Sequence, residues 1–211
     1  MRTHHSRIAF SWMGAAILFI VANVGGYAQS NSGDFRGEIV AKWLPDGRNL
    51  SLIQPFGYTD AGGQAWDVPA GSETDGASIP KVFWLTHPPF TGKYRSAAVI
   101  HDYYCRTQTR SWQETHNVFY EAMRTAGVDE RTAKVMWGAV YSFGPRWGDQ
   151  TRRGASRFSS VQNVKEQSIF MKNLESWVRR ANPNRDEIAK AIDDGQILIE
   201  CSVLAPVLAS N

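Results

Sequence analysis

The chain changes its residue pattern near Pro80, and this change limits the possible folds more than any other feature. Between residues 36 and 70, short β-prone runs alternate with turn residues. From residue 93 to 143, apolar residues recur at the three- and four-residue spacing of amphipathic helices. Strands followed by a run of helices predict an α+β fold, with a small antiparallel sheet packed on an antiparallel helical bundle.

A β-hairpin is predicted at the start of this sheet. Residues 38–43 are β-prone and lead into Pro45-Asp46-Gly47. Proline presets φ and glycine accepts positive φ, so this triplet is typical of a turn. Residues 50–53 are expected to return as the second strand, and residues 58–68 to add another.

Helices are expected to follow. Ser111 and Glu114 have the spacing of a capping box, in which each side chain bonds the other residue's backbone amide. Near the C-terminus, residues 197–199 predict a late strand. The expected helices cover residues 93–106, 111–126, 129–143, 164–180 and 186–192.

The N-terminal segment, residues 1–28, has the three parts of a secretory signal peptide. Residues 1–7 are short and basic, residues 8–24 are almost wholly apolar, and the segment ends in a small-x-small pattern. We expect cleavage after Ala28 and export to the periplasm or the medium. The alternative is an uncleaved anchor, but the apolar run is slightly shorter than the ~20 residues that span a bilayer.

The mature chain would keep 183 residues, with no later run of spanning length. We expect a flexible start at 29–35, a core domain at 36–147 and a helical extension at 148–211 packed on that core. Because Arg2 and Arg7 leave with the signal, 23 basic and 20 acidic residues become 21 and 20. Such a balanced charge predicts no nucleic-acid partner.

Cys105 and Cys201 are the only two cysteines of the chain. In an oxidising compartment an isolated pair is more often bridged than free, so the sequence predicts a Cys105–Cys201 disulfide. Two separately buried thiols are the alternative.

His101 and His116 are the most informative pair of side chains. They lie on predicted helices on either side of a short connection, 106–110, and such a connection makes neighbouring helices antiparallel. The midpoint between the two positions falls inside this connection, so both imidazoles should lie at equal height on facing stripes. A functional site is predicted there, and hydrogen-bonded core histidines are the alternative.

Two carboxylates accompany the histidines. Asp102 follows His101 directly and lies about 100° around the helix from it, so the two side chains point in different directions. Asp75 lies in the irregular stretch between the sheet and the helices, where Asp75-Gly76 also suits a turn and Ser78 a helix cap. The candidate catalytic residues are therefore His101, Asp102, Asp75 and His116.

A longer set of motifs surrounds these residues. It comprises Asp75-Gly76-Ala77-Ser78-Ile79-Pro80, then Trp84, Pro89 and Gly92, and then the run 97–104. Together they resemble domain-of-unknown-function family 1353, which occurs in bacteria and phages. The resemblance covers roughly residues 36–147 and implies no assigned activity. The family usually carries an acidic residue where His116 stands and an aromatic residue where Cys105 stands.

The run His101-Asp102-Tyr103-Tyr104-Cys105 is also similar to the His-Asp-x-Cys-Tyr helix of secretory phospholipases. There the histidine is a general base and the aspartate holds calcium. The glycines of their calcium loop are missing here, so the similarity concerns chemistry and not a lipid substrate.

The first functional hypothesis is an exported hydrolase that acts on cell-envelope material. His101 would take a proton from water or a substrate hydroxyl, Asp75 or Asp102 would orient it, and His116 would be a second acid–base group. In a metal-dependent version, a divalent ion would be held by His101, His116 and Asp75, with the fourth position open as in catalytic zinc sites.

The second hypothesis is a non-enzymatic binding or structural module of the envelope. Its His and Asp side chains would form a buried hydrogen-bond network that joins the helices to the Asp75-Gly76 turn. This hypothesis adds a docking face that would consist of Tyr103, Tyr104, Arg146, Trp147, Arg152, Arg153 and Arg157. The alternative for its basic residues is a solvated loop.

Overall fold

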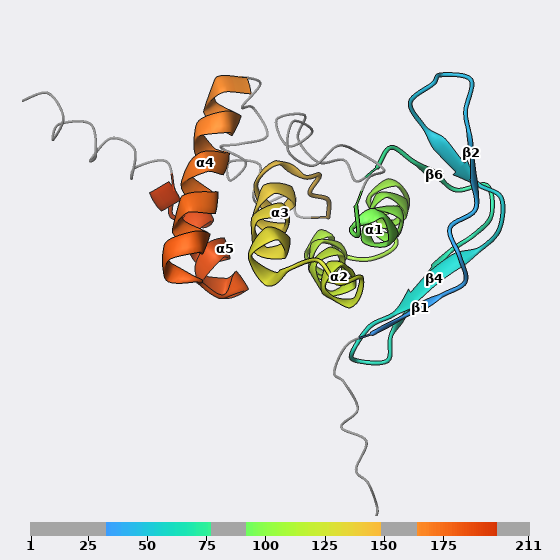
Figure 1. The fold of residues 1–211 in the computed structure, drawn as a ribbon, viewed down its shortest axis with the longest axis horizontal. Coiled ribbons are helices and arrows are strands. Elements are labelled where there is room, and N and C mark those ends of the chain that lie inside the picture. Colours follow the sequence, from blue (N-terminus) through green and yellow to red (C-terminus); the bar gives the residue numbers. More distant parts are fainter. Residues whose placement is uncertain (1–32, 77–91, 149–163, 198–211) are drawn as a thin grey trace, which may run out of the picture. The chain divides into compact units, whose positions relative to one another are not determined.

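The computed structural model describes residues 33–76, 92–148 and 164–197, which belong to one compact unit. Short strands come first and helices follow (Figure 1), which confirms the predicted α+β class. In chain order the elements are β1 (Asp34–Arg36), β2 (Ala41–Trp43), β3 (Leu50–Leu52), β4 (Phe56–Thr59), β5 (Ala65–Val68), β6 (Glu73–Thr74), α1 (Arg95–Thr107), α2 (Trp112–Thr125), α3 (Glu130–Phe143), α4 (Val164–Ala181) and α5 (Arg185–Asp193).

The strands form two antiparallel sheets instead of the single small sheet that the sequence predicts. One sheet has the order β1-β4-β5 and the other β2-β3-β6. In the first, Tyr58 of β4 lies opposite Phe35 and Trp66. The division falls at Pro55, which lacks a backbone N–H and so cannot continue the ladder of β3 into β4.

The hairpin of β2 and β3 forms as predicted, with Trp43 opposite Leu50. In its turn, Asp46 Oδ1 accepts hydrogen bonds of 2.9 Å from the backbone amides of Arg48 and Asn49. Gly47 has a φ of +67°, a conformation that glycine adopts without strain. Local turn chemistry therefore sets this hairpin.

Helices α1, α2 and α3 occupy the ranges that the sequence predicts, within two residues at each end. The capping box of α2 is present: Glu114 N donates to Ser111 Oγ over 3.2 Å, and Ser111 N donates to the Glu114 carboxylate over 3.0 Å. Asp129 caps α3 by accepting from Thr132 N over 3.0 Å. These caps satisfy amides that the first turn leaves without intrahelical partners.

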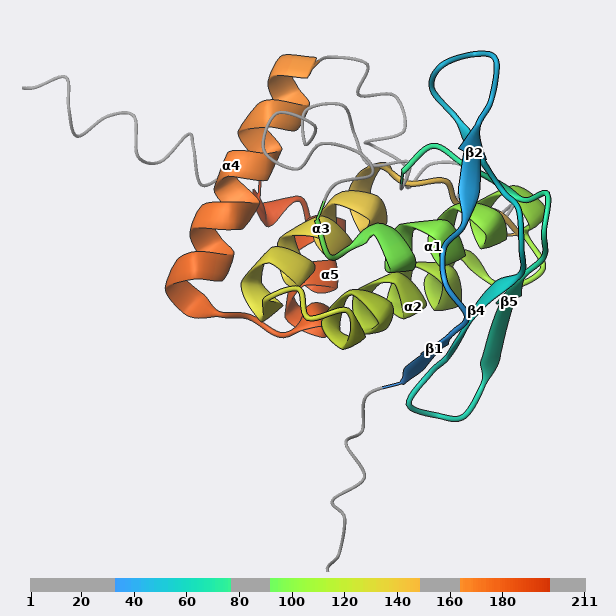
Figure 2. The ribbon, with the colours of Figure 1, turned by 45° about the vertical axis from the view of Figure 1, so that its right-hand side comes forward.

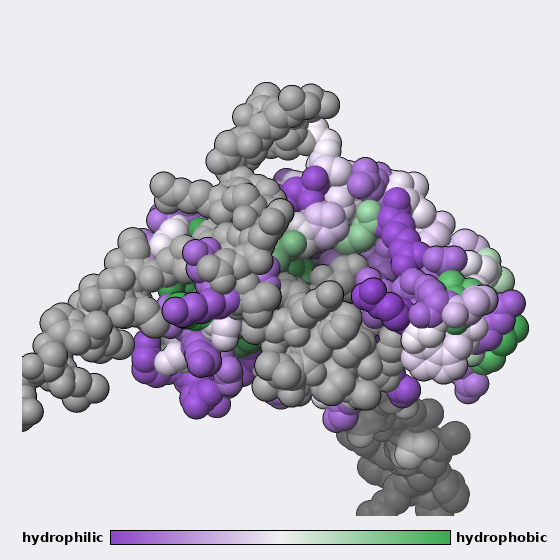
Figure 3. All heavy atoms as spheres, turned by 90° about the horizontal axis from the view of Figure 1, so that it is seen from above, coloured by the Kyte–Doolittle hydropathy of each residue, from purple (hydrophilic) through white to green (hydrophobic). Residues whose placement is uncertain are grey.

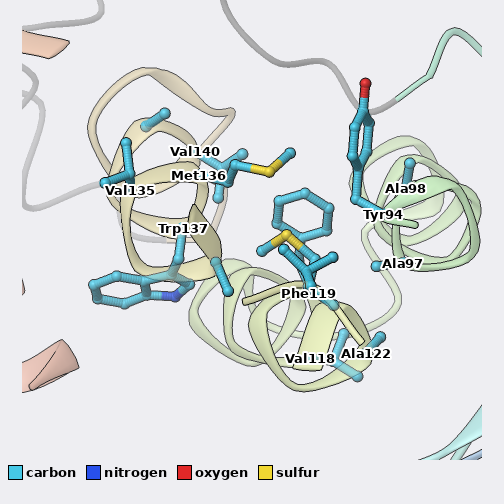
Figure 4. Packing of buried hydrophobic residues seen from close by; sticks show 14 of the residues in the cluster. Tyr94, Ala97, Ala98, Val118, Phe119, Ala122, Val135, Met136, Trp137 and Val140 are labelled. Atoms are coloured by element: carbon cyan, nitrogen blue, oxygen red, sulfur yellow. The ribbon is translucent and has the colours of Figure 1, made fainter. Parts of the chain in front are cut away.

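The core lies between successive helices. Helix α2 packs between α1 and α3, while α4 and α5 contact α3 (Figure 2). Figure 4 shows Phe119 of α2 between Ala97 of α1 and Met136 of α3, and all three are fully buried. Gly138 of α3 lets α4 approach closely, because a Cβ there would lie 2.7 Å from a methyl carbon of Leu174.

Helix α1 is also fastened to the strands. The Asp67 backbone amide donates to Tyr104 Oη over 3.0 Å, and the rings of Trp66 and Tyr104 meet edge to face at 4.8 Å. Arg106 pairs with Glu73 at 3.0 Å. Helix α1, which carries His101, is therefore held in a defined position against β5 and β6.

The described surface is mostly hydrophilic on the face shown in Figure 3. Large apolar side chains that are exposed include Val40, Trp43 and Ile53, on or beside the β2–β3 hairpin. Within the three described ranges, no helix has both the length and the apolar character needed to cross a membrane.

Several predictions fall outside the described residues. They concern the signal peptide, Ser78 and the rest of the motif to Pro89, the arginines at 152, 153 and 157, residues 198–199 of the late strand, and Cys201. The expected domain limits at 36–147 and 148–211 stay a prediction, although α4 and α5 do pack on α3.

Candidate functional site

The structure brings His101 and His116 face to face. His101 Nε2 lies 3.0 Å from His116 Nδ1, and both side chains are 0% exposed. The two rings come from α1 and α2, which the short connection after Thr107 places side by side. The spacing argument therefore places the pair correctly, while its catalytic role stays a prediction.

Aromatic rings surround the histidine pair. His101 packs on Phe119, with ring centroids 4.9 Å apart, and His116 packs on Trp112 at 5.5 Å. The guanidinium of Arg146 stacks on the Trp112 ring, 4.3 Å from the ring centroid. Such walls exclude water and strengthen the electrostatic interactions inside them.

Cys105 joins the two histidines. It lies one turn after His101 on α1, and its Sγ is 3.5 Å from His101 Nε2 and 3.8 Å from His101 Nδ1. Ligand atoms of His101, Cys105 and His116 all lie within 4.8 Å of one another, and all three residues are buried. Cys105 is a free thiol in the structure.

Asp102 connects this cluster to the strands. Its Oδ2 accepts a 2.6 Å hydrogen bond from Thr74 Oγ1 and a 3.2 Å hydrogen bond from the Asp75 backbone amide. Its Oδ1 lies 3.9 Å from His101 Nδ1. The carboxylate is only 1% exposed, so it joins β6 to α1 in the interior.

Asp75 takes part through its backbone. Its side chain is half-buried and does not belong to the group of ligand atoms around His101. The next residue, Gly76, has a φ of +90° and donates its amide to Thr74 Oγ1 over 3.2 Å. The Asp75-Gly76 turn is therefore held by hydrogen bonds from its backbone amides to Asp102 and Thr74.

The outer nitrogen of His116 is the unusual atom of the site. Nε2 is buried and makes no hydrogen bond of normal geometry with a described residue, although the Pro145 backbone lies near enough to raise the pKa of this ring. It points toward the end of α3, where a Cβ at Gly144 would lie 3.1 Å from it. Buried polar atoms are rarely left without a hydrogen bond, so this nitrogen is a candidate for contact with a ligand.

The two imidazoles differ in charge. Burial lowers the pKa of His101, but Cys105 and Asp102 together outweigh burial and raise this pKa to about 9. Burial, the charge of His101 and that of Arg146 hold the pKa of His116 well below its usual range. Near neutral pH the pair thus carries one positive charge, on His101, whose Nε2 then donates to His116 Nδ1.

Sequence reasoning assigned Cys105 to a disulfide instead of this cluster and did not single out Thr74. The signal for Cys105 was its four-residue spacing from His101, which places both on one face of the helix. Thr74 carries no comparable signal, because its contact with Asp102 spans 28 residues. Since Cys201 lies outside the described residues, the Cys105–Cys201 disulfide stays a prediction.

A comparison with known protein families found a match. Residues 50–140 match the family model DUF1353, described as a protein of unknown function. Residues 50–140 of the chain are therefore similar to this family. This confirms the resemblance seen in the sequence motifs, and the segment includes every residue of the cluster.

Two relatives come from Sinorhizobium fredii (strain NBRC 101917 / NGR234), and both are described as uncharacterized proteins. Protein y4iH is 41% identical over 126 residues, which cover 58% of this chain and 53% of the relative. Protein y4jT is 44% identical over 104 residues, which cover 49% of this chain and 31% of the relative. The chain thus matches about half of one relative and a third of the other. No solved structure matches it.

Proposed function

We propose that this protein is an exported, non-enzymatic module of the cell envelope, in which the His–Asp cluster locks the helices to the strands. The observation that carries this proposal is burial. His101 and His116 are 0% exposed and Asp102 is 1% exposed, whereas a hydrolytic site must admit its substrate and water.

The lock is a continuous chain of polar contacts. It runs from Thr74 on β6 to Asp102 and His101 on α1, and from there to His116 on α2. A buried polar network makes a fold rigid and specific to the extent that its members satisfy one another, and in this network His116 Nε2 is the atom left without a partner. The Asp75-Gly76 turn is held by the same network.

The charge state of His101 supports the same proposal. An imidazole whose pKa is raised to about 9 is already protonated at neutral pH. It therefore cannot accept a proton from water or from a substrate hydroxyl, which is the role of a general base. The described cavity of about 610 Å³ is lined by Thr74 and Gly76 of this network, but neither His101 nor His116 lines it.

Replacing either histidine tests the lock. His101→Gln and His116→Gln each remove the hydrogen bond between the two imidazoles, which joins α1 to α2. Each also leaves a buried polar group unsatisfied. We expect each to lower the free energy of unfolding by about 2 kcal/mol, measured by urea denaturation of metal-free protein. Gln113→Ala, at an exposed position on α2, is the control. Unchanged stability in both cluster variants contradicts the proposal.

A hydrolase is the second candidate, and the buried Nε2 of His116 is the observation that favours it. This nitrogen belongs to a neutral imidazole and lacks a partner among the described residues. Such a ring is able to exchange protons with a substrate if the site opens. Assays on peptidoglycan and phospholipid distinguish the candidates: a hydrolase loses turnover in His116→Gln while its stability stays near that of the wild type.

Export is part of the proposal and rests on the N-terminal residue pattern. Expression of the full chain in a bacterium, followed by fractionation and intact-mass measurement, tests it. We expect the protein outside the cytoplasm with Gln29 as its first residue. If the full-length chain stays in the cytoplasm, export is contradicted, but the structural role of the His–Asp cluster is unaffected.

A further inference from the structure

We propose that His101, His116 and Cys105 form a binding site for a zinc-type transition-metal ion. The inference concerns the same centre as the proposed lock but goes beyond it, because the polar contacts from Thr74 to His116 exist without a metal. The three side chains come from two helices, and all three are buried.

The spacing of the ligand atoms suits such an ion. Zinc binds imidazole nitrogen at about 2.0–2.1 Å and thiolate sulfur at about 2.3 Å in a tetrahedron, so two nitrogens lie about 3.3 Å apart and nitrogen and sulfur about 3.5 Å apart. Here His101 Nε2 and His116 Nδ1 are 3.0 Å apart, and His101 Nε2 and Cys105 Sγ are 3.5 Å apart. Small side-chain shifts are enough to admit an ion.

The donor set selects the class of metal. Two imidazoles and one thiolate suit zinc and copper, whereas magnesium and calcium take oxygen ligands. The sequence hypothesis used Asp75 as the third ligand, but Cys105 occupies that place in the structure. A fourth position is left for water or another ligand, as in zinc sites with three protein ligands.

The surroundings of the ligands also fit. Metal-bound histidines usually direct their second ring nitrogen to a carboxylate or a carbonyl. His101 would bind through Nε2, and its Nδ1 lies 3.9 Å from Asp102 Oδ1. His116 would bind through Nδ1, and its buried Nε2 lies beside Gly144 and Pro145. The carboxylate is itself held by Thr74.

Cobalt provides a direct test, because Co²⁺ replaces Zn²⁺ and its thiolate complexes absorb light. We would titrate Co²⁺ into reduced, metal-free full-length protein. The expected result is one ion per chain, a thiolate-to-cobalt charge-transfer band and the visible bands of tetrahedral cobalt, all abolished by Zn²⁺. No band at one equivalent overturns the site.

Variants assign the ligands. Cys201→Ser leaves Cys105 as the single thiol of the chain, so the charge-transfer band must persist in it if Cys105 is the ligand. Cys105→Ser must lose the band, and His101→Gln or His116→Gln must weaken binding by at least about tenfold. A band that survives in Cys105→Ser, or that is lost in Cys201→Ser, overturns the assignment.

The redox state of Cys105 gives an independent check. A Cys105–Cys201 disulfide removes the thiolate, so its presence in protein recovered after export, seen by non-reducing peptide mass spectrometry, overturns the metal site. The lock is judged separately, by urea denaturation of metal-free variants. Stability loss in His101→Gln without cobalt binding keeps the lock and rejects the metal, and cobalt binding without that loss does the reverse.

Discussion

At the scale of single residues, the behaviour of the centre follows from placing two imidazoles 3.0 Å apart in the interior. Two positively charged rings would repel each other there, so the folded protein keeps only one positive charge on the pair. His101 carries that charge because Cys105 and Asp102 lie beside it, whereas His116 faces Arg146. The asymmetry of the surroundings thus decides the charge of each ring.

This asymmetry predicts a maximum of stability near pH 6.5 for metal-free protein. In the unfolded chain both histidines titrate near 6.5. Below that pH the unfolded chain binds a proton at His116, whereas the folded protein keeps this ring neutral because its pKa is lowered. The free energy of unfolding therefore falls as the pH falls. Above it the folded state keeps the proton of His101 up to about pH 9, so stability falls as the pH rises toward 9.

Urea midpoints measured across this range check the prediction. The double variant His101→Gln with His116→Gln lacks both titrating rings and should show a flatter pH profile. Identical profiles in the wild type and the double variant would contradict the assigned charges.

Thr74 is predicted to stabilise the buried carboxylate. Thr74→Val removes the 2.6 Å hydrogen bond to Asp102 Oδ2 and the acceptor of the Gly76 amide, while keeping the shape of the side chain. We expect a loss of about 2 kcal/mol in the free energy of unfolding, because hydrogen bonds to charged groups contribute more than neutral ones. Thr109→Val, at an exposed position, is the control and should change little.

At the scale of elements, the start of α2 is set by its own residues. The capping box of α2 fixes where that helix begins, and hence the turn on which His116 lies. The turn between β2 and β3 is likewise held by Asp46 and Gly47. These devices act over two to four residues, which is why they operate independently of the core.

Removing the α2 cap should have a measurable cost. Ser111→Ala leaves the Glu114 amide without its acceptor, and we expect a loss of about 1 kcal/mol in the free energy of unfolding. The pKa of Glu114, which the hydrogen bonds from Ser111 lower, should rise toward its usual value. Carboxyl NMR titration and urea denaturation measure the two effects. Gln113→Ala, exposed in the first turn, is the control.

At the scale of the whole molecule, α3 joins the site-bearing helices to the C-terminal ones. It contacts α2 on one side and α4 and α5 on the other. The closest approach is at Gly138, where the absence of a side chain makes room for Leu174. The described part of the protein should therefore unfold as one cooperative unit.

Leu174→Ala tests this connection. Leu174 is 0% exposed and fills the space beside Gly138, so its truncation should lower the free energy of unfolding by about 3 kcal/mol. Lys172→Ala, on the exposed side of α4, should have little effect. Equal effects of the two variants, or two separate unfolding transitions in the wild type, would show that α4 does not share the core.

The success of sequence reasoning depended on the range of the contacts involved. The facing histidines were predictable because their spacing, a short connection and helical geometry suffice to bring them to one height. The division into two sheets was not predicted, because strand pairing such as that of Phe35 with Tyr58 depends on packing across the sheet. Cys105 was assigned to a disulfide from the expected compartment alone.

The order of strands and helices, the hairpin turn, the capping box of α2 and the facing imidazoles could all be derived from the amino-acid sequence. All of these arise from neighbours within a turn or one short connection. The contact of Cys105 with the histidine pair and that of Thr74 with Asp102, across 28 positions, become visible in the folded chain. Burial explains both contacts, since a carboxylate and a protonated imidazole inside a protein must find partners wherever the chain brings them.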